Sequence, residues 1–488
     1  MKDVVIVGGG IAGLAAGWRL RHWDTLLLES EGRVGGRIRS ERRGPYWLNW
    51  GGHVYAGGNS STAWLLGDTG IDSTPVTGSL AGLAMNGRLL LDGRVASYPF
   101  RIPMPRSARV GMVKAGARVA LAVARYARIA RLRPGEDETT RQQRVYDFMN
   151  DRTFADFVGD LPEDAEALFK PTVTRSAADI DQISAGAGVG YFSLVWNNGG
   201  GLSQSILGGP STLTEGIAAA LSDRVRLNAT VDEIVQKNGS VVVRYRQDEV
   251  EKEIEARCVV LATPATVSHR VAVDLDSDVR EALSKIVYGP YVSAAFLTDE
   301  TEPQVWDDAY AIATPKRSFN IVLNLSNIAR GLESERRPGS SLMTFSPGGL
   351  ARKLLELDDD EVRRSYLDDL SQVLPGFADK VVEAEVQRWP TGAPYCFPGR
   401  GKLQQTLTRR SGRVLLAGDY LGTLYTETAI QTGLSAAQEA QSLLATDRQA
   451  TPRGLPGTRR RVRPLPPSGA TTGLPTASPE ETRECRHS

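Results

Sequence analysis

The segment Gly8-Gly9-Gly10-Ile11-Ala12-Gly13 constrains the fold more than any other part of the sequence. It follows the apolar run 4–7, which has the length of a buried strand, and it opens a helical pattern that reaches about Arg21. A second apolar run, 25–28, then ends at Glu29. Strand, glycine turn, helix and strand in this order form a βαβ unit. The pattern predicts an α/β protein that begins with a Rossmann-type dinucleotide-binding domain.

Each glycine of the turn has a physical role in such a domain. Gly8 permits a tight turn, Gly10 lets the backbone approach a pyrophosphate, and Gly13 lets the helix pack closely on the strand. The helix N-terminus offers amides to the phosphates, and Glu29 accepts hydrogen bonds from the adenosine ribose. An isolated glycine turn that merely lets a helix pack is the alternative, but the strand, the helix and the spaced acid favour cofactor binding. The predicted contacts here are Gly8, Gly10, Ile11, Ala12, Gly13, Glu29 and Ser30.

Composition narrows the partners of the chain. Lysine and arginine total 58 against 57 acidic residues, so no bulk charge favours nucleic acid. The three cysteines, Cys258, Cys396 and Cys485, are far apart and lack CxxC spacing, so we expect neither disulfides nor a metal site. The apolar run 4–7 is too short for a signal sequence, and no apolar run has the roughly 20 residues of a membrane span. We expect a cytoplasmic protein, and no pattern indicates its oligomeric state.

The chain divides into alternating segments of two lobes. We assign 1–100, 205–284 and 396–445 to the cofactor domain, and 101–204 and 285–395 to a mixed α+β substrate domain that carries a helical insertion. The segment 446–488 holds seven of the 26 prolines beyond residue 450 and is predicted to be a disordered tail. The predicted helix 106–133 has eight basic residues and no acid. We favour a solvated face for it, with peripheral membrane contact as the alternative.

A cationic loop follows Glu29. Arg33-Val34-Gly35-Gly36-Arg37 places two arginines beside two flexible backbone positions. With the glycine turn and the acid before it, this loop resembles the flavin-containing amine oxidase and protoporphyrinogen oxidase superfamily, and the resemblance covers residues 1 to about 445. It implies FAD as cofactor, a contact of Arg37 with the pyrophosphate, and Arg33 and Gly36 as neighbours. A surface salt bridge is the alternative for Arg33.

The segment Asn49-Trp50-Gly51-Gly52-His53 resembles the next loop of this superfamily on the flavin side, although Asn49 stands where an acid is usual. The resemblance implies that Gly51 and Gly52 contact the cofactor. It also places His53 near the flavin, where an imidazole orients substrate or exchanges a proton. A loop histidine bonded to backbone is the alternative reading of His53.

The C-terminal run 413–419 is a predicted strand that ends in Gly418-Asp419, and a small-residue helix follows from about Thr428 to Leu444. It resembles the second FAD fingerprint of the superfamily. The resemblance implies that Asp419 bonds the ribityl or pyrophosphate region and that the helix beginning near Thr428-Ala429 points its positive end at the flavin. It also implies that the backbone of Val231 meets the adenine.

The substrate side carries weaker signals. Amine oxidases of the superfamily usually place a lysine near the flavin, in the strand that aligns with Tyr288–Phe296, and this chain has none there. The absence of this lysine favours a resemblance to those members that oxidise porphyrinogens or desaturate carbon–carbon bonds. Tyr395 and Tyr425 are the candidate cavity aromatics, which would sandwich a planar or cationic substrate, with plain packing as the alternative.

Together these patterns predict an FAD-dependent oxidoreductase. It would abstract a hydride from a C–N or C–C single bond of a small metabolite, with Tyr395, Tyr425 and His53 at the catalytic site and molecular oxygen as acceptor. Two alternatives stay open, namely a redox-neutral flavin isomerase or mutase and a flavin-binding partner protein without catalysis.

Overall fold

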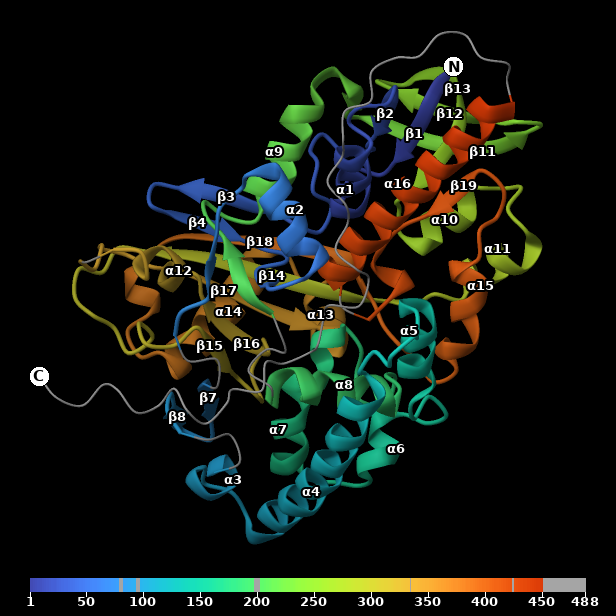
Figure 1. Ribbon diagram of the computed structural model, residues 1–488. Coiled ribbons are helices and arrows are strands. Elements are labelled where there is room, and N and C mark those ends of the chain that lie inside the picture. Colours follow the sequence, from blue (N-terminus) through green and yellow to red (C-terminus); the bar gives the residue numbers. More distant parts are fainter. Residues whose placement is uncertain (79–81, 94–96, 197–201, 334, 424, 451–488) are drawn as a thin grey trace, which may run out of the picture.

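The computed structural model describes all residues except 79–81, 94–96, 197–201, 334, 424 and 451–488. Two seven-stranded sheets each form the centre of a lobe, and a group of helices adjoins the second sheet (Figure 1). The mixed α/β architecture predicted from the sequence is therefore confirmed.

The sheet of the cofactor lobe has the order β10-β2-β1-β13-β12-β11, and β19 pairs with β13. Strands β10, β2, β1, β13 and β19 run parallel, whereas β11 and β12 add an antiparallel edge. The central strand is buried on both faces, as expected for a parallel sheet covered by helices. The bounds are β1 Lys2–Val7, β2 Thr25–Leu28, β10 Val225–Arg226, β11 Ala229–Lys237, β12 Ser240–Gln247, β13 Val250–Leu261 and β19 Val414–Leu416.

Helices cover both faces of this sheet. One face packs against α1 (Ile11–Arg19), α9 (Ser211–Leu221) and α16 (Tyr425–Ala450), and the other against α10 (Ala265–Val271) and α11 (Ser277–Ser284). Helices α1 and α16 lie side by side (Figure 1), and a Cβ added at Gly433 would lie 2.1 Å from the carbonyl oxygen of Ala12. The first and last helices of the fold therefore touch at backbone distance.

The second sheet has the order β18-β14-β17-β16-β15-β7-β8. One face packs on α14 (Asp359–Val373), and the other faces the cofactor lobe across a second apolar cluster. Strands β7 and β8 lie within the segment 1–100 that we assigned to the cofactor lobe, yet β7 pairs with β15 of this sheet. The bounds are β7 Gly82–Met85, β8 Arg88–Leu90, β14 Tyr288–Thr298, β15 Ala311–Ala313, β16 Ile321–Asn324, β17 Ser341–Pro347 and β18 Val381–Pro394, with α12 Ser326–Arg330 and α13 Gly348–Leu354 between them.

The predicted helical insertion forms one end of the molecule (Figure 1). Its longest helix, α4, spans Arg106–Ile129 and buries only a narrow stripe, Ala108, Ala115, Val119 and Ala122, against the other helices. A cluster rich in phenylalanine fills the centre of the insertion. The remaining helices are α3 Tyr98–Arg101, α5 Glu138–Asp147, α6 Phe154–Val158, α7 Glu163–Val173, the short 3-10 helix η2 Thr174–Ser176, and α8 Ala185–Trp196.

Two small sheets and two short helices complete the fold. The hairpin β3 (Ser40–Arg43) and β4 (Tyr46–Asn49) precedes the three-stranded sheet β5-β9-β6, which spans Tyr55–Ala56, Leu202–Ile206 and Ser73–Pro75. Helix α2 (Ser61–Thr69) packs on α16, and the short helix α15 (Gln404–Thr408) lies beside the cofactor lobe.

The C-terminal helix α16 is longer than predicted. It runs to Ala450, so residues 446–450, which we expected at the start of a disordered tail, are helical. The physical reason is an ion-pair cluster in which Asp447 binds Arg413 and Arg257, joining the last turn to the cofactor sheet. The rest of the predicted tail lies outside the described residues. Within the described part of the chain, no helix is long and apolar enough to cross a membrane.

Candidate functional site

The glycine turn after β1 has the geometry that its sequence predicted. Gly8 adopts a φ of +104°, and a Cβ at Gly13 would lie only 1.9 Å from the carbonyl oxygen of Gly8. A Cβ at Gly10 would meet no heavy atom within 4 Å. Gly8 therefore makes the turn and Gly13 the close packing, while Gly10 borders open space, as a backbone that receives a phosphate must.

The N-terminus of α1 is left free to bind an anion. Its N-cap residue, Gly10, has no side chain that could cap the helix, and the first turn holds no acidic residue. The first amides of a helix have no partner within the helix, and the helix dipole favours negative charge there. This end of α1 can therefore bind the pyrophosphate of a dinucleotide through the amides near Ile11 and Ala12.

The acid at the end of β2 is fixed before any ligand binds. Glu29 is 8% exposed, and its carboxylate accepts hydrogen bonds from the backbone amides of Gly9 at 2.6 Å and Glu31 at 2.8 Å. The hydroxyl of Ser30 donates a third at 3.2 Å. A carboxylate has about four lone-pair sites, so Glu29 keeps capacity for a ribose hydroxyl.

Arg33 shapes its own loop. Its guanidinium donates to the carbonyls of Val34 at 3.1 Å, Gly36 at 2.7 Å and Ile38 at 3.2 Å, and no ion pair involves it among the described residues. Gly36, with a φ of +56°, then lies opposite Gly10: a Cβ there would be 3.4 Å from the Gly10 Cα. Arg33 therefore holds the loop against the glycine turn. The surface salt bridge that we considered as an alternative is not formed within the described part of the chain.

Arg37 and Asp419 join the two ends of the chain. Their ion pair measures 2.8 Å, and Arg37 also donates to the carbonyl of Gly392 at 2.9 Å. Burial opposes the charge of Arg37, but the Asp419 carboxylate outweighs it and raises the pKa of Arg37. Asp419 follows Gly418, whose φ of +149° turns the chain after β19. The two predicted fingerprints thus meet in one polar cradle.

The loop after β4 closes the cradle toward the second lobe. A Cβ at Gly51 would lie 2.1 Å from the carbonyl oxygen of Arg37, and one at Gly52 would lie 3.5 Å from the hydroxyl of Thr426 in the first turn of α16. Both glycines therefore lie where the Arg37 loop and the start of α16 converge. Asn49 is buried below them and donates to the carbonyl of Gly51 at 3.3 Å.

His53 makes the backbone bond that one of its two interpretations predicted, and its place near a flavin stays a prediction. Its Nδ1 lies 3.3 Å from the carbonyl oxygen of Gly51, and its ring lies 6.2 Å from that of Phe345 on β17. Burial lowers the pKa of His53 to about 4, and the nearby charge of Arg175 adds to this effect. The imidazole is therefore neutral at pH 7, and a proton on Nδ1 leaves Nε2 as an acceptor.

The two predicted cavity tyrosines have different surroundings. The ring of Tyr425, in the first turn of α16, lies 6.2 Å from that of Tyr191 on α8. Tyr395 instead packs against the phenylalanine cluster of the insertion, and its amide donates to the carbonyl of Val287 at 3.2 Å. Among the described residues Tyr395 makes no ring contact with Tyr425, so the structure pairs Tyr425 with Tyr191.

Two residues near Tyr425, Tyr291 and Arg175, were not predicted from the sequence motifs. The hydroxyls of Tyr291, on β14, and Tyr425 both donate to the backbone carbonyl of Arg175 in η2. The ring of Tyr291 also packs on Phe345, at 5.7 Å. Tyr291 lies in the strand that aligns with the lysine-bearing strand of the superfamily, and that position was a usable signal. Nothing in the local sequence around Arg175 marked it.

The remaining predicted contacts lie on the elements expected. Val231, 8% exposed, is on β11 next to a register shift in its pairing with β12. Thr428 and Ala429 are buried in the first turns of α16. Their neighbour Glu427 accepts from the amides of Ser61 and Thr62 and so caps α2. Their contact with a cofactor stays a prediction.

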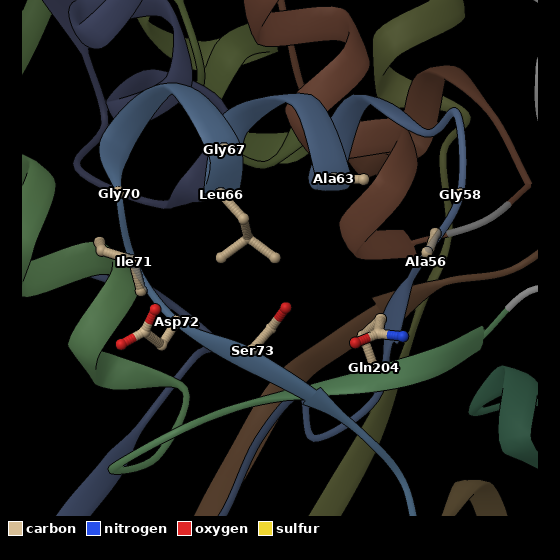
Figure 2. Close-up of a pocket in the computed structure, with 11 residues that line it drawn as sticks. Ala56, Gly58, Ala63, Leu66, Gly67, Gly70, Ile71, Asp72, Ser73 and Gln204 are labelled. Carbon is tan, nitrogen blue, oxygen red and sulfur yellow. The ribbon is translucent and has the colours of Figure 1, made fainter.

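A separate cavity of about 400 Å³ lies between α2 and the β5-β9-β6 sheet (Figure 2). Figure 2 shows Leu66 pointing into it from α2, with Ser73 and Gln204 on the opposite side. Its other lining residues are Ala56, Gly57, Gly58, Ala63, Gly67, Gly70, Ile71 and Asp72. None of the predicted site residues lines this cavity, so it is distinct from the cradle.

Comparison with known proteins adds a family. The model of the family described as flavin containing amine oxidoreductase matches residues 11–441. A relative in Mycobacterium tuberculosis, named as the flavin-containing monoamine oxidase AofH, is 27% identical over 296 residues, which are 56% of this chain and 59% of the relative. The chain thus matches little more than half of that relative. The flavin-containing amine oxidase B of Canis lupus familiaris is 25% identical over 90% of this chain and 85% of its own length.

Solved structures agree in fold. Putrescine oxidase bound to putrescine superposes with a TM-score of 0.72 at 18% identity, over 90% of this chain and 99% of that one. Cyclohexylamine oxidase from Brevibacterium oxydans gives a TM-score of 0.71 at 18% identity, over 92% and 99% of the two chains. At this identity the likeness establishes the two-lobe fold.

Proposed function

Because the chain belongs to the flavin-containing amine oxidoreductase family, we propose that it is an enzyme that oxidises the C–N single bond of a small-molecule amine. FAD is the cofactor of this family, and when bound it accepts the hydride that leaves the carbon. The observation that carries the proposal is the cradle in which Arg37 and Asp419 meet beside the free N-terminus of α1.

Different residues of the cradle would bind different parts of FAD. The N-terminus of α1 and Arg37 would hold the pyrophosphate, and Glu29 the ribose of the adenosine. Asp419 would accept hydrogen bonds from the ribityl hydroxyls, and the first turn of α16 would point its positive helix end at the flavin. Gly51 and Gly52 would let the flavin lie close to the backbone. Val231 would meet the adenine.

The substrate side would orient the amine. His53 is neutral, so it accepts a hydrogen bond without repelling a substrate amine. Tyr425 and Tyr191 present two rings between α16 and α8, where a small apolar substrate could pack. The reaction balances when the amine loses two electrons and two protons to form an imine. Molecular oxygen accepts the two electrons and two protons and becomes hydrogen peroxide. Water then hydrolyses the imine to a carbonyl compound and ammonia or an amine.

The C–N bond is favoured over the C–C alternative that the missing lysine suggested. The relatives reported above bear amine-oxidase names, and the family model describes amine oxidoreductases. Cys258 and Cys396 are free thiols, which supports the expected cytoplasmic location. No observation favours the isomerase or the non-catalytic partner.

Steady-state oxygen uptake tests the proposal. The purified holoprotein is incubated with primary amines, secondary amines, amino acids and a porphyrinogen, and oxygen, hydrogen peroxide and carbonyl product are measured together. We expect one amine class to yield all three changes in equal amounts. Oxidation of the porphyrinogen alone would contradict the C–N assignment, and product formation without oxygen uptake would support the isomerase.

A further inference from the structure

Arg175 lies where the substrate domain meets the cofactor lobe. Its backbone carbonyl accepts the hydroxyls of Tyr291 from β14 and Tyr425 from α16. Because α16 begins at Tyr425, beside the Gly52 loop, these two bonds fix η2 next to the candidate flavin position. The guanidinium of Arg175 therefore extends from a backbone that is anchored on both lobes.

The guanidinium has no counter-ion among the described residues. Its Nε is buried and makes no hydrogen bond, and no carboxylate forms an ion pair with it in the described part of the chain. Burial lowers the pKa of Arg175, because its surroundings desolvate the charged guanidinium. Arg175 is half-buried, and leaving its buried Nε without a partner is unfavourable, so the arrangement points to a partner that arrives from outside.

Several partly buried arginines of the fold are neutralised by a carboxylate of the chain. Arg37 binds Asp419, and Arg330 binds Asp307 at 2.6 Å. Arg144 also leaves its Nε unpaired, but its terminal nitrogens bond to Glu136 and to backbone carbonyls. Arg33 and Arg400 also lack an ion pair, but their guanidinium nitrogens donate to oxygen atoms of the chain, whereas no such bond involves the Arg175 guanidinium among the described residues.

The surroundings of Arg175 suit an anion. The charge of Arg175 acts on His53, Tyr291 and Tyr310, none of which carries a negative charge at pH 7. The hydroxyl of Tyr310 is buried and has no hydrogen-bond partner. A guanidinium with free donors beside an unpaired hydroxyl donor, and no carboxylate, is the arrangement that binds a carboxylate group.

We propose that Arg175 binds a carboxylate of the substrate, so that the substrate class is an amine that carries a carboxylate, such as an amino acid. The inference rests on the proposed function, because it adds a recognition element to the same site. A carboxylate beside Arg175 would be neutralised, whereas a second ammonium group there would be repelled. The geometry thus favours amino carboxylates over diamines and over simple monoamines.

Matched substrates test the proposal. Phenylalanine, as both enantiomers, is compared with phenethylamine, and leucine with 3-methylbutylamine, by the rate and half-saturation of anaerobic flavin reduction. In the wild type we expect the amino acids to be preferred. Arg175→Met should raise their half-saturation on the order of 100-fold and leave that of the amines within about threefold. Arg175→Lys should recover part of the loss, because it restores the charge without the fork of donors.

A binding measurement gives a readout that does not need turnover. Benzoate and uncharged benzamide are titrated into the oxidised holoprotein, and perturbation of the flavin absorbance reports binding. Benzoate should bind more tightly than benzamide to the wild type, and equally weakly to Arg175→Met. The control Arg128→Met removes an exposed arginine of α4 and should preserve the benzoate preference.

The outcomes separate this inference from the proposed function. Reduction by the amines as well as by the amino acids, with no benzoate preference, overturns the role of Arg175 and leaves amine oxidation standing. Failure of every amine and amino acid to reduce the flavin overturns the proposed function instead. If Arg175→Met does not fold, the comparison of benzoate with benzamide in the wild type and in Arg175→Lys still decides.

Discussion

The cofactor cradle and the substrate face differ in whether their polar groups have partners within the chain. In the cradle, Glu29 accepts two backbone amides, Arg33 donates to three carbonyls, and Arg37 binds Asp419. The substrate face is the group formed by His53, Arg175, Tyr291 and Tyr310. There, the Nε of Arg175 and the hydroxyl of Tyr310 are buried without partners. The charged groups of the cradle are paired within the chain, whereas these two donors of the substrate face are not.

The difference concerns what each region must do. A cofactor that stays bound is positioned best by a rigid, preorganised first layer, and the mutual bonds of the cradle supply one. A substrate must bind and leave, so its site keeps unpaired groups that the substrate itself satisfies. We therefore expect cradle substitutions to alter stability and FAD retention, and substrate-face substitutions to alter selectivity.

The largest effect should come from Gly13. A Cβ there would lie 1.9 Å from the Gly8 carbonyl, so Gly13→Ala forces α1 away from β1 and should destabilise the protein by about 3 kcal/mol or more. Urea unfolding followed by circular dichroism measures the change. Unfolding at the wild-type urea concentration would show that the helix and strand do not need this close contact.

Gly10→Ala is the matched counterpart, because the added methyl meets only open space. The apoprotein should unfold at the wild-type urea concentration, since a φ of −68° suits alanine. FAD should bind at least about 100-fold more weakly, because the methyl occupies space needed by the pyrophosphate. Fluorescence titration of apoprotein with FAD measures this, and unchanged affinity would contradict the placement of the phosphates at α1.

The Arg37–Asp419 pair should contribute less. In a double-mutant cycle of Arg37→Met and Asp419→Asn, we expect a coupling of about 1–2 kcal/mol in the unfolding free energy of the apoprotein, since the pair is only partly shielded from water. Independent effects of the two substitutions would show that the ends of the chain meet without this ion pair.

At pH 7 the smallest effect comes from His53, because its contribution changes only as pH drops below the ordinary pKa of histidine. Its folded-state pKa of about 4 lies below the ordinary 6.5, so between these values the unfolded chain binds a proton that the folded chain does not. Stability should therefore fall as pH drops through that range, by up to about 1.4 kcal/mol per pH unit. His53→Asn should remove this part of the slope of unfolding free energy against pH. An unchanged slope in that variant would mean that the folded protein protonates His53 normally.

The sequence predicted the cradle well because its parts are local. The turn at Gly8–Gly13, the loop at Arg33–Arg37 and the strand before Asp419 each carry their geometry in a few consecutive residues. The helical insertion was also predicted, from its alanine-rich pattern at 106–133. Pairing of β7 with β15 was missed, because no local pattern says which sheet a short strand joins.

The substrate face was harder to predict for the same reason. Tyr291, Tyr310, Arg175 and His53 come from four separated segments, and only the packing of the second sheet against the cofactor lobe brings them together. Tyr395 was selected for its place beside a motif, yet it packs against the insertion. The unpaired Nε of Arg175 and the unpaired hydroxyl of Tyr310 have no signature in the sequence.

Anaerobic titration of the holoprotein with amines and amino acids, followed by flavin absorbance, tests the central claim most directly. The account predicts that one equivalent of a suitable amine bleaches one equivalent of bound FAD, that admission of air restores the yellow colour, and that Gly10→Ala protein, which retains little FAD, shows no such change. A protein that holds FAD at full occupancy, and whose flavin no amine or amino acid reduces, would contradict it.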